Sequence, residues 1–206
     1  MKKIICLMLT LALCFAVSVC FAEAAEDISI FGEQDGAKYE NATMGVGCVL
    51  EGWKYGTQDE IMARYNLVQS SSSEEVAELL KNNTAVIVMY ADSANQTQNA
   101  SLTLDSQAAE FVKVYGEALY TQALINQYEQ IAPGQGWKDF TCEAIEYQIG
   151  TKTVKGVKDT FTLNGVKVFQ KQLAWLNGDY VNILTVSCYL TDDCDSVLEH
   201  FYLLGE

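Results

Sequence analysis

The chain has one proline and one histidine among its 206 residues, and only 13 lysines and arginines. Scarce proline in a composition that is half apolar excludes a disordered or linker-rich protein and favours a folded domain with a sizeable core. Structural zinc sites usually pair their ligands two to four residues apart, and no cysteine or histidine here has such a neighbour. The sequence therefore predicts no metal centre of that kind.

Basic residues are few compared with the 27 acidic ones, which gives a formal net charge of −14. A surface of this sign repels nucleic acids and anionic lipids, because binding to phosphates requires lysine and arginine. It favours solubility, cationic partners or divalent cations. We therefore expect no nucleic-acid partner.

The N-terminus has the pattern of a secretory signal peptide over residues 1–24. A basic start at residues 1–3 precedes an uncharged apolar stretch, and Ala22 and Ala24 are the small residues expected near a cleavage point. The alternatives are an uncleaved anchor and lipidation at Cys20, although Cys20 lacks a small residue directly before it. Cleavage would leave 11 basic and 26 acidic residues and no integral membrane segment. We expect a secreted or cell-envelope protein.

The stretch from Lys158 to Leu190 predicts three antiparallel strands joined by turns at Asn164-Gly165 and Asn177-Gly178. In this register Phe161 faces Val168 and Trp175 faces Tyr180. Apolar residues lie on both faces of these strands. Both faces of the sheet should therefore be covered, most simply by helices.

The remaining segments complete a fold of mixed helices and strands. Residues 25–38 are acidic, contain two glycines and predict a flexible leader. Residues 39–206 then predict one domain. Its expected elements are a first strand, two short helices each opened by a Thr/Ser-x-x-Glu capping box, a hairpin, a long helix over 107–130, four strands and a terminal helix beginning near Thr191. This is an α+β domain with a largely antiparallel sheet of about seven strands sandwiched by helices.

The same order of elements resembles the PsbP-like proteins. The resemblance covers about residues 39–204 and is carried by Tyr39-Glu40-Asn41 entering the first strand, Glu51-Gly52-Trp53 leaving it, and Asn164-Gly165 before an amphiphilic strand. Leu50-Glu51-Gly52-Trp53 lacks the proline often found at this turn in the family. The family includes extrinsic photosystem II subunits, a nuclear-transport factor and small exported bacterial proteins. The resemblance implies a noncatalytic binding or assembly module, and it transfers no catalytic residue.

Four cysteines follow the signal peptide: Cys48, Cys142, Cys188 and Cys194. Each is set among apolar residues, which favours buried thiols that act as small apolar side chains. A disulfide between Cys188 and Cys194 is the alternative, because an exported chain permits bridges and six residues separate a strand end from a helix start. A cysteine enzyme using Cys194 and His200 is disfavoured, since that spacing places the two on opposite sides of a helix.

The acidic group Asp192, Asp193 and Asp195 offers oxygen ligands for calcium, but capping of the terminal helix explains it more simply. We expect no cofactor.

Aromatic residues at turns and strand ends are the best candidates for a binding surface. Trp53, Tyr55, Trp137, Trp175 and Tyr180 occupy such positions, where side chains recur in protein and sugar recognition. The alternative is that they pack in the core or at its rim. We expect Trp53, Trp137, Trp175 and Tyr180 to recognise a protein or cell-envelope component, with a small-ligand or metal carrier as the alternative function.

Overall fold

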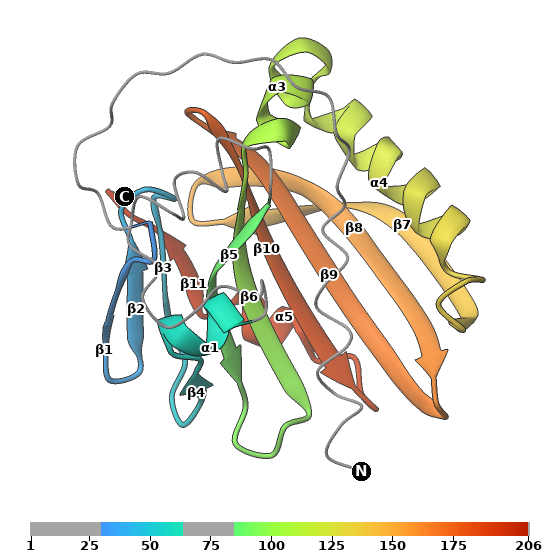
Figure 1. The fold of residues 1–206 in the computed structure, drawn as a ribbon, viewed down its shortest axis with the longest axis horizontal. Helices are drawn as coiled ribbons and strands as arrows, with labels where there is room; N and C mark the ends of the chain where they lie inside the picture. Colours follow the sequence, from blue (N-terminus) through green and yellow to red (C-terminus); the bar gives the residue numbers. More distant parts are fainter. Residues whose placement is uncertain (1–29, 64–84, 206) are drawn as a thin grey trace.

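A computed structural model describes residues 30–63 and 85–205 of the chain. Seven strands form one antiparallel sheet in the order β4-β5-β6-β10-β9-β8-β7 (Figure 1). Its strands are β4 (Lys54–Tyr55), β5 (Val86–Asp92), β6 (Gln98–Asp105), β7 (Lys138–Ile149), β8 (Lys152–Leu163), β9 (Val166–Asn177) and β10 (Tyr180–Tyr189). The expected α+β class and the large antiparallel sheet are confirmed. The predicted signal peptide, residues 1–24, lies outside the described residues.

The two Asn-Gly turns behave differently. At the first, Asn164 and Gly165 both have positive φ and Phe161 faces Val168, as predicted. At the second, Asn177 pairs with Tyr180, so Trp175 faces Asn182 and the predicted register is corrected by two residues. The Asn177 side-chain amide donates to the carbonyl oxygen of Thr43 at 2.9 Å, which keeps this residue in the strand and moves the turn to the next two residues.

Two helices, α3 (Ser106–Tyr115) and α4 (Glu117–Ile131), replace the single long helix expected over 107–130. Gly116 separates them with φ 82° and ψ 161°, a conformation that only glycine adopts without strain. An added methyl group at this glycine would meet no atom within 4 Å, so the residue breaks the helix and does not serve close packing against the sheet. At the start of α3, the Asp105 carboxylate caps the helix by accepting the Ala108 amide at 2.8 Å.

A second sheet of four strands was not expected. Its order is β1-β2-β3-β11, with β1 (Glu33–Asp35), β2 (Lys38–Asn41), β3 (Val46–Val49) and β11 (Phe201–Leu203). The expected leader therefore ends earlier than predicted, because β1 pairs with β2 within residues 33–40. The expected terminal helix is a short α5 (Cys194–Leu198), and the chain then enters β11.

Helix α1 (Gln58–Ala63) follows β4 and begins with the predicted capping box. Thr57 N donates to Glu60 Oε2 at 3.0 Å, and Glu60 N donates to Thr57 Oγ1 at 3.2 Å. The second short helix, expected after Ser72, lies outside the described residues.

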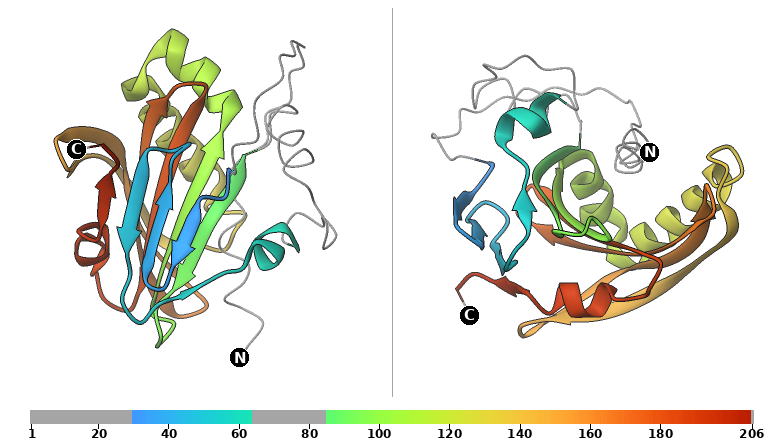
Figure 2. Two further views of the ribbon diagram at one scale, coloured as in Figure 1. Left: turned by 90° about the vertical axis from the view of Figure 1, so that its left-hand side faces the viewer. Right: turned by 90° about the horizontal axis from the view of Figure 1, so that it is seen from below.

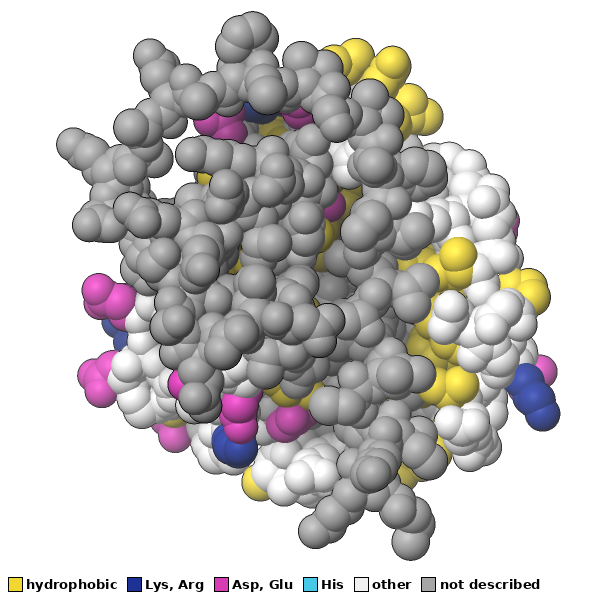
Figure 3. All heavy atoms as spheres, in the orientation of Figure 1, with side chains coloured by type: hydrophobic (Ala, Val, Ile, Leu, Met, Phe, Trp, Pro, Cys, Tyr) yellow, Lys and Arg dark blue, Asp and Glu magenta, His cyan; other side chains and the backbone are white. Residues whose placement is uncertain are grey.

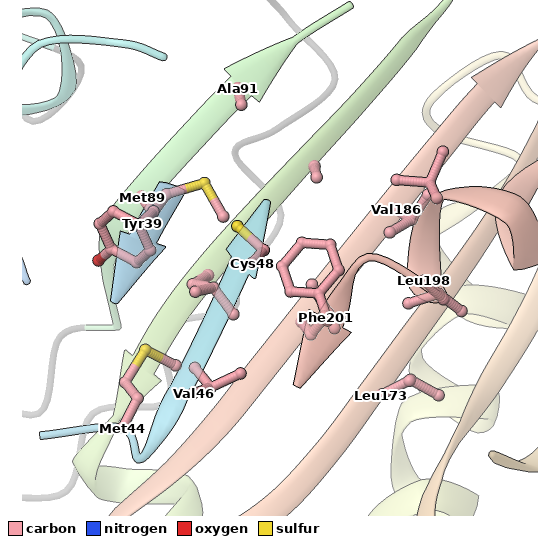
Figure 4. Packing of buried hydrophobic residues seen from close by; sticks show 14 of the residues in the cluster. Tyr39, Met44, Val46, Cys48, Met89, Ala91, Leu173, Val186, Leu198 and Phe201 are labelled. Carbon is pink, nitrogen blue, oxygen red and sulfur yellow. The ribbon is translucent and has the colours of Figure 1, made fainter. Parts of the chain in front are cut away.

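The large sheet is covered on both faces (Figure 2). Helices α3 and α4 pack on one face, where one apolar cluster contains Val112 and Ile183 and another contains Leu124 and Val157. The small sheet and α5 pack on the other face. Figure 4 shows Val46, Cys48 and Phe201 of the small sheet set against side chains of the large one. The core between the two sheets contains more buried apolar residues than the layer between the large sheet and the two helices.

Large apolar side chains are exposed where the two helices meet. Val114, Tyr115 and Leu119 are 72%, 59% and 48% exposed, and Figure 3 shows hydrophobic side chains at the end of the molecule where α3 lies. Exposed apolar patches are typical of surfaces that contact other molecules. Among residues 30–63 and 85–205, no helix combines the length and apolar character needed to cross a bilayer.

The break at Gly116 yields a stability prediction. Gly116→Ala should lower the free energy of unfolding by about 1–3 kcal/mol, because alanine is strained at this positive φ. Gly134→Ala is the matched control: an added methyl group there makes only an ordinary contact, 3.5 Å from the Ile131 carbonyl oxygen. Urea unfolding of both variants measures the effect, and equal stability of the two would contradict the strain argument.

Candidate functional site

The predicted aromatic surface is not assembled in the structure. Trp175 is 2% exposed and lies in the core between the two sheets. Trp137 lies on the opposite face of the large sheet, where its ring stacks on Phe161 with centroids 4.3 Å apart. Trp53 and Tyr180 are half-buried and pack against the core that contains Trp175. Three tryptophans divided between two faces of a sheet cannot form one binding surface.

A pocket is present elsewhere, between β1 and β2 on one side and β4, β5 and α1 on the other. We call it the seam pocket, and its volume is about 160 Å³. Its described lining residues are Phe31, Gly32, Gln34, Tyr39, Tyr55, Gly56, Thr57, Gln58, Ile61, Val88 and Met89. The pocket lies where the edge of the small sheet meets the edge of the large one.

Two stacked tyrosines form part of the wall of the seam pocket. The rings of Tyr39 and Tyr55 lie with centroids 6.2 Å apart and planes 22° from parallel. The Tyr39 hydroxyl donates to the Phe31 carbonyl oxygen at 2.8 Å, and the Tyr55 hydroxyl donates to the Ala37 carbonyl oxygen at 2.9 Å. Burial raises the pKa of both hydroxyls, so both stay neutral at ordinary pH. The hydroxyls are thus occupied by the backbone.

The rim of the seam pocket is polar and neutral. Gln34, Thr57 and Gln58 are exposed, and none of the described lining residues carries a charge. This neutrality contrasts with the acidic character of the chain as a whole. An apolar, aromatic wall with neutral amides and hydroxyls at its mouth suits an uncharged ligand group that has both apolar and polar surface.

Sequence reasoning missed most of this pocket. Among its described lining residues, only Tyr55 was named as a candidate for binding. The others come from segments far apart in the chain, and Phe31 and Gln34 belong to the region expected to be a leader. Tyr39 and Asn41 alternate as buried residues of β2, but the predicted domain already began at Tyr39, so this pattern gives no signal for Phe31 or Gln34.

A second unusual group is the buried carboxyl of Asp159 on β8. Asp159 is 0% exposed beneath α4, and no described side chain donates a hydrogen bond to either of its oxygens. Cys142 and Gln170 are its neighbours on the adjacent strands. The nearby Tyr128 hydroxyl donates to Gln172 instead. Burial raises the pKa of Asp159 to about 8, so the carboxyl is protonated at neutral pH.

The cysteines occupy buried or half-buried positions. Burial raises the pKa of Cys48 to about 11 and that of Cys142 to about 12, so both thiols stay protonated at neutral pH. Cys188 and Cys194 are buried, while His200 is exposed.

The acidic group before α5 is engaged in local contacts. Asp192 pairs with Lys158 at 2.7 Å and Asp195 pairs with Lys171 at 2.5 Å. Asp193 accepts a hydrogen bond from the Thr191 hydroxyl at 2.6 Å. In the described part of the chain, no three histidine, cysteine, aspartate or glutamate side chains gather as metal ligands would. Lysine side chains and a hydroxyl are the partners of these carboxylates.

The buried carboxyl makes stability depend on pH. Asp159 holds its proton in the folded state up to about pH 8, whereas its ordinary pKa is 3.8. Between these values the folded state binds the extra proton, so stability falls as pH rises, by about 1.4 kcal/mol per pH unit for this group. Asp159→Asn should remove this slope between pH 5 and 7.5, as measured by urea unfolding. The exposed Asp179→Asn is the control and should keep the parent slope; an unchanged slope in Asp159→Asn would refute the assignment.

Neither the protein-family models nor the curated proteins contain a match to this chain. Among solved structures, the chain is similar to LpqN of Mycobacterium tuberculosis, described as involved in cell envelope biogenesis. The TM-score is 0.35 and the sequence identity 14%, over 77% of this chain and 83% of LpqN.

Proposed function

We propose that this chain is an exported, noncatalytic binding module that holds a neutral group of a protein or cell-envelope component in the seam pocket. The observation that carries the proposal is the pocket itself: about 160 Å³, walled by Tyr39 and Tyr55 and free of charge among its described lining residues. Small concave sites with an apolar wall and a few placed polar groups are the usual form of binding sites.

The chemistry of the lining favours holding a ligand over converting it. Its hydroxyls on Tyr39 and Tyr55 are bonded to backbone carbonyls and stay protonated. The exposed polar side chains are neutral, and amides and hydroxyls of this kind orient a ligand by hydrogen bonds. A charged ligand group would lose its hydration here without gaining a partner of opposite sign.

A soluble carrier of a free small molecule is the second candidate. The volume of the pocket accommodates a group comparable to one side chain or one sugar ring, which suits both candidates. The two candidates share one site and differ in whether the bound group is free or attached to a larger molecule.

The proposal includes a PsbP-like fold. The seven-stranded antiparallel sheet with α3 and α4 on one face supports it. The other face departs from a sandwich of helices, because a four-stranded sheet and the short α5 cover it.

Thermal unfolding with defined probes tests the pocket. The probes are N-acetylglucosamine, a cell-wall disaccharide and short neutral peptides with one apolar side chain. A ligand that binds only the folded state at a hundredfold excess over its Kd adds about 2.7 kcal/mol, which raises Tm by about 5–10 °C for a domain of this size. A shift with the free monosaccharide favours the carrier, and a shift only with the disaccharide or peptides favours recognition of a larger partner.

Variants of the pocket rim make this test specific. Gln58→Ala removes an exposed amide at the mouth of the pocket, and Gly56→Ala adds a methyl group that makes only ordinary contacts, 3.6 Å from Tyr90. Both should reduce the ligand-induced shift in Tm while leaving the Tm of the free protein nearly unchanged. Gln122→Ala, on the exposed side of α4, is the matched control. The proposal is wrong if no probe shifts Tm, or if the three variants respond alike.

A further inference from the structure

Two of the four described cysteines lie together at the end of the large sheet. Cys188 stands near the end of β10 and Cys194 is the first residue of α5, and they are 1% and 0% exposed. The Cys194 thiol donates to the carbonyl oxygen of Phe169 at 3.4 Å. Phe169 is the residue of β9 directly opposite Cys188. The Cys194 side chain therefore reaches the part of the sheet where Cys188 lies.

The two thiols also differ in acidity because of this contact. A hydrogen bond between the two side chains lowers the pKa of Cys188, and the Asp193 backbone contributes in the same direction. The same hydrogen bond raises the pKa of Cys194, and burial raises it further. With α5 docked, Cys188 is therefore the more acidic of the two thiols.

The segment that carries Cys194 is held to the sheet by ion pairs on either side of it. Lys158 of β8 binds Asp192, and Lys171 of β9 binds Asp195. Lys171 is itself buried, and its ammonium lies 5.8 Å from the centre of the Tyr147 ring. These contacts hold the start of α5 against the sheet beside the strand pair that contains Cys188.

We propose that Cys188 and Cys194 form a disulfide bridge under oxidising conditions, which fastens the start of α5 to the end of β10. All four described cysteines are unbridged in the structure. The bridge closes a loop of only a few residues, and it secures the segment that leads from the large sheet to β11. This proposal stands independently of the seam pocket.

The reaction is a thiol–disulfide exchange with a low-molecular-weight disulfide such as glutathione disulfide. One of the two cysteines, as its thiolate, attacks one sulfur of glutathione disulfide, forms a mixed disulfide and releases one glutathione thiolate. The other cysteine then loses its proton and attacks the sulfur of the first, which releases the second glutathione thiolate. Two protein thiols are oxidised, one disulfide is reduced to two glutathione thiols, and the released thiolates take up the two protons.

Burial sets when this exchange occurs. Because both sulfurs are covered in the folded domain, an external disulfide reaches them while α5 is undocked, during folding or transient opening. Once α5 is docked, the finished bridge is shielded from reductants in the same way. We therefore expect slow reduction of the bridge in the native state and fast reduction in denaturant.

Refolding in a glutathione redox buffer tests the bridge. The purified full chain is reduced in urea, refolded in reduced and oxidised glutathione, alkylated in urea and digested for mass spectrometry. The expected result is a peptide pair linked through Cys188 and Cys194, with Cys48 and Cys142 alkylated. The oxidised protein should melt about 5–9 °C above the reduced protein. The proposal is overturned if Cys188 and Cys194 are both alkylated after refolding, or if either is linked to another cysteine.

Variants separate the bridge from a packing effect. Cys188→Ala and Cys194→Ala should each abolish the difference in Tm between oxidised and reduced protein. Cys142→Ser changes a half-buried cysteine outside the pair and should keep that difference. If Cys194→Ala folds poorly, Cys194→Ser tests the same point, because serine keeps a small side chain that cannot form the bridge. A redox-dependent Tm that survives in both Cys188 and Cys194 variants would overturn the proposal.

Discussion

The apolar character of both faces of the seven-stranded sheet governs the rest of the fold. Val157 and Ile183 face the helices, while Leu173 and Leu184 face the small sheet. A sheet of this kind is stable only when both faces are removed from water, so described elements outside it pack as covers on each face. The helices α3 and α4 supply one cover, and the second is assembled from both ends of the described chain. The position of the seam pocket follows, because it lies where the second cover meets the edge of the sheet.

Local signals predicted the elements whose residues are neighbours in sequence. The turn at Asn164 and Gly165 and the capping box of Thr57 and Glu60 depend on contacts a few residues long, and both are present. Features that depend on distant contacts were missed. The register after Asn177 depends on a carbonyl group more than a hundred positions away, at Thr43. The second sheet depends in the same way on pairing between opposite ends of the domain.

The candidate site was hard to predict for a related reason. Tryptophan is rich in apolar area, and Trp175 and Trp137 stabilise the two covers of the sheet by packing within them. The seam pocket is lined by only one or two residues from each of β1, β2, β4, α1 and β5. No single stretch of sequence contains enough of its lining to be recognised. Tyr55 was noticed because of its aromatic ring, but its role depends on Tyr39 beside it.

The pairing of β11 with β3 also bears on the order of events in synthesis. Phe201 lies opposite Cys48, about 150 positions earlier in the chain, so the small sheet gains its last strand only after nearly all of the domain has been made. Until then the core side chains Val46 and Cys48 lack the cover that Phe201 provides. The topology of the small sheet therefore makes the last part of this core depend on a contact between residues far apart in the chain.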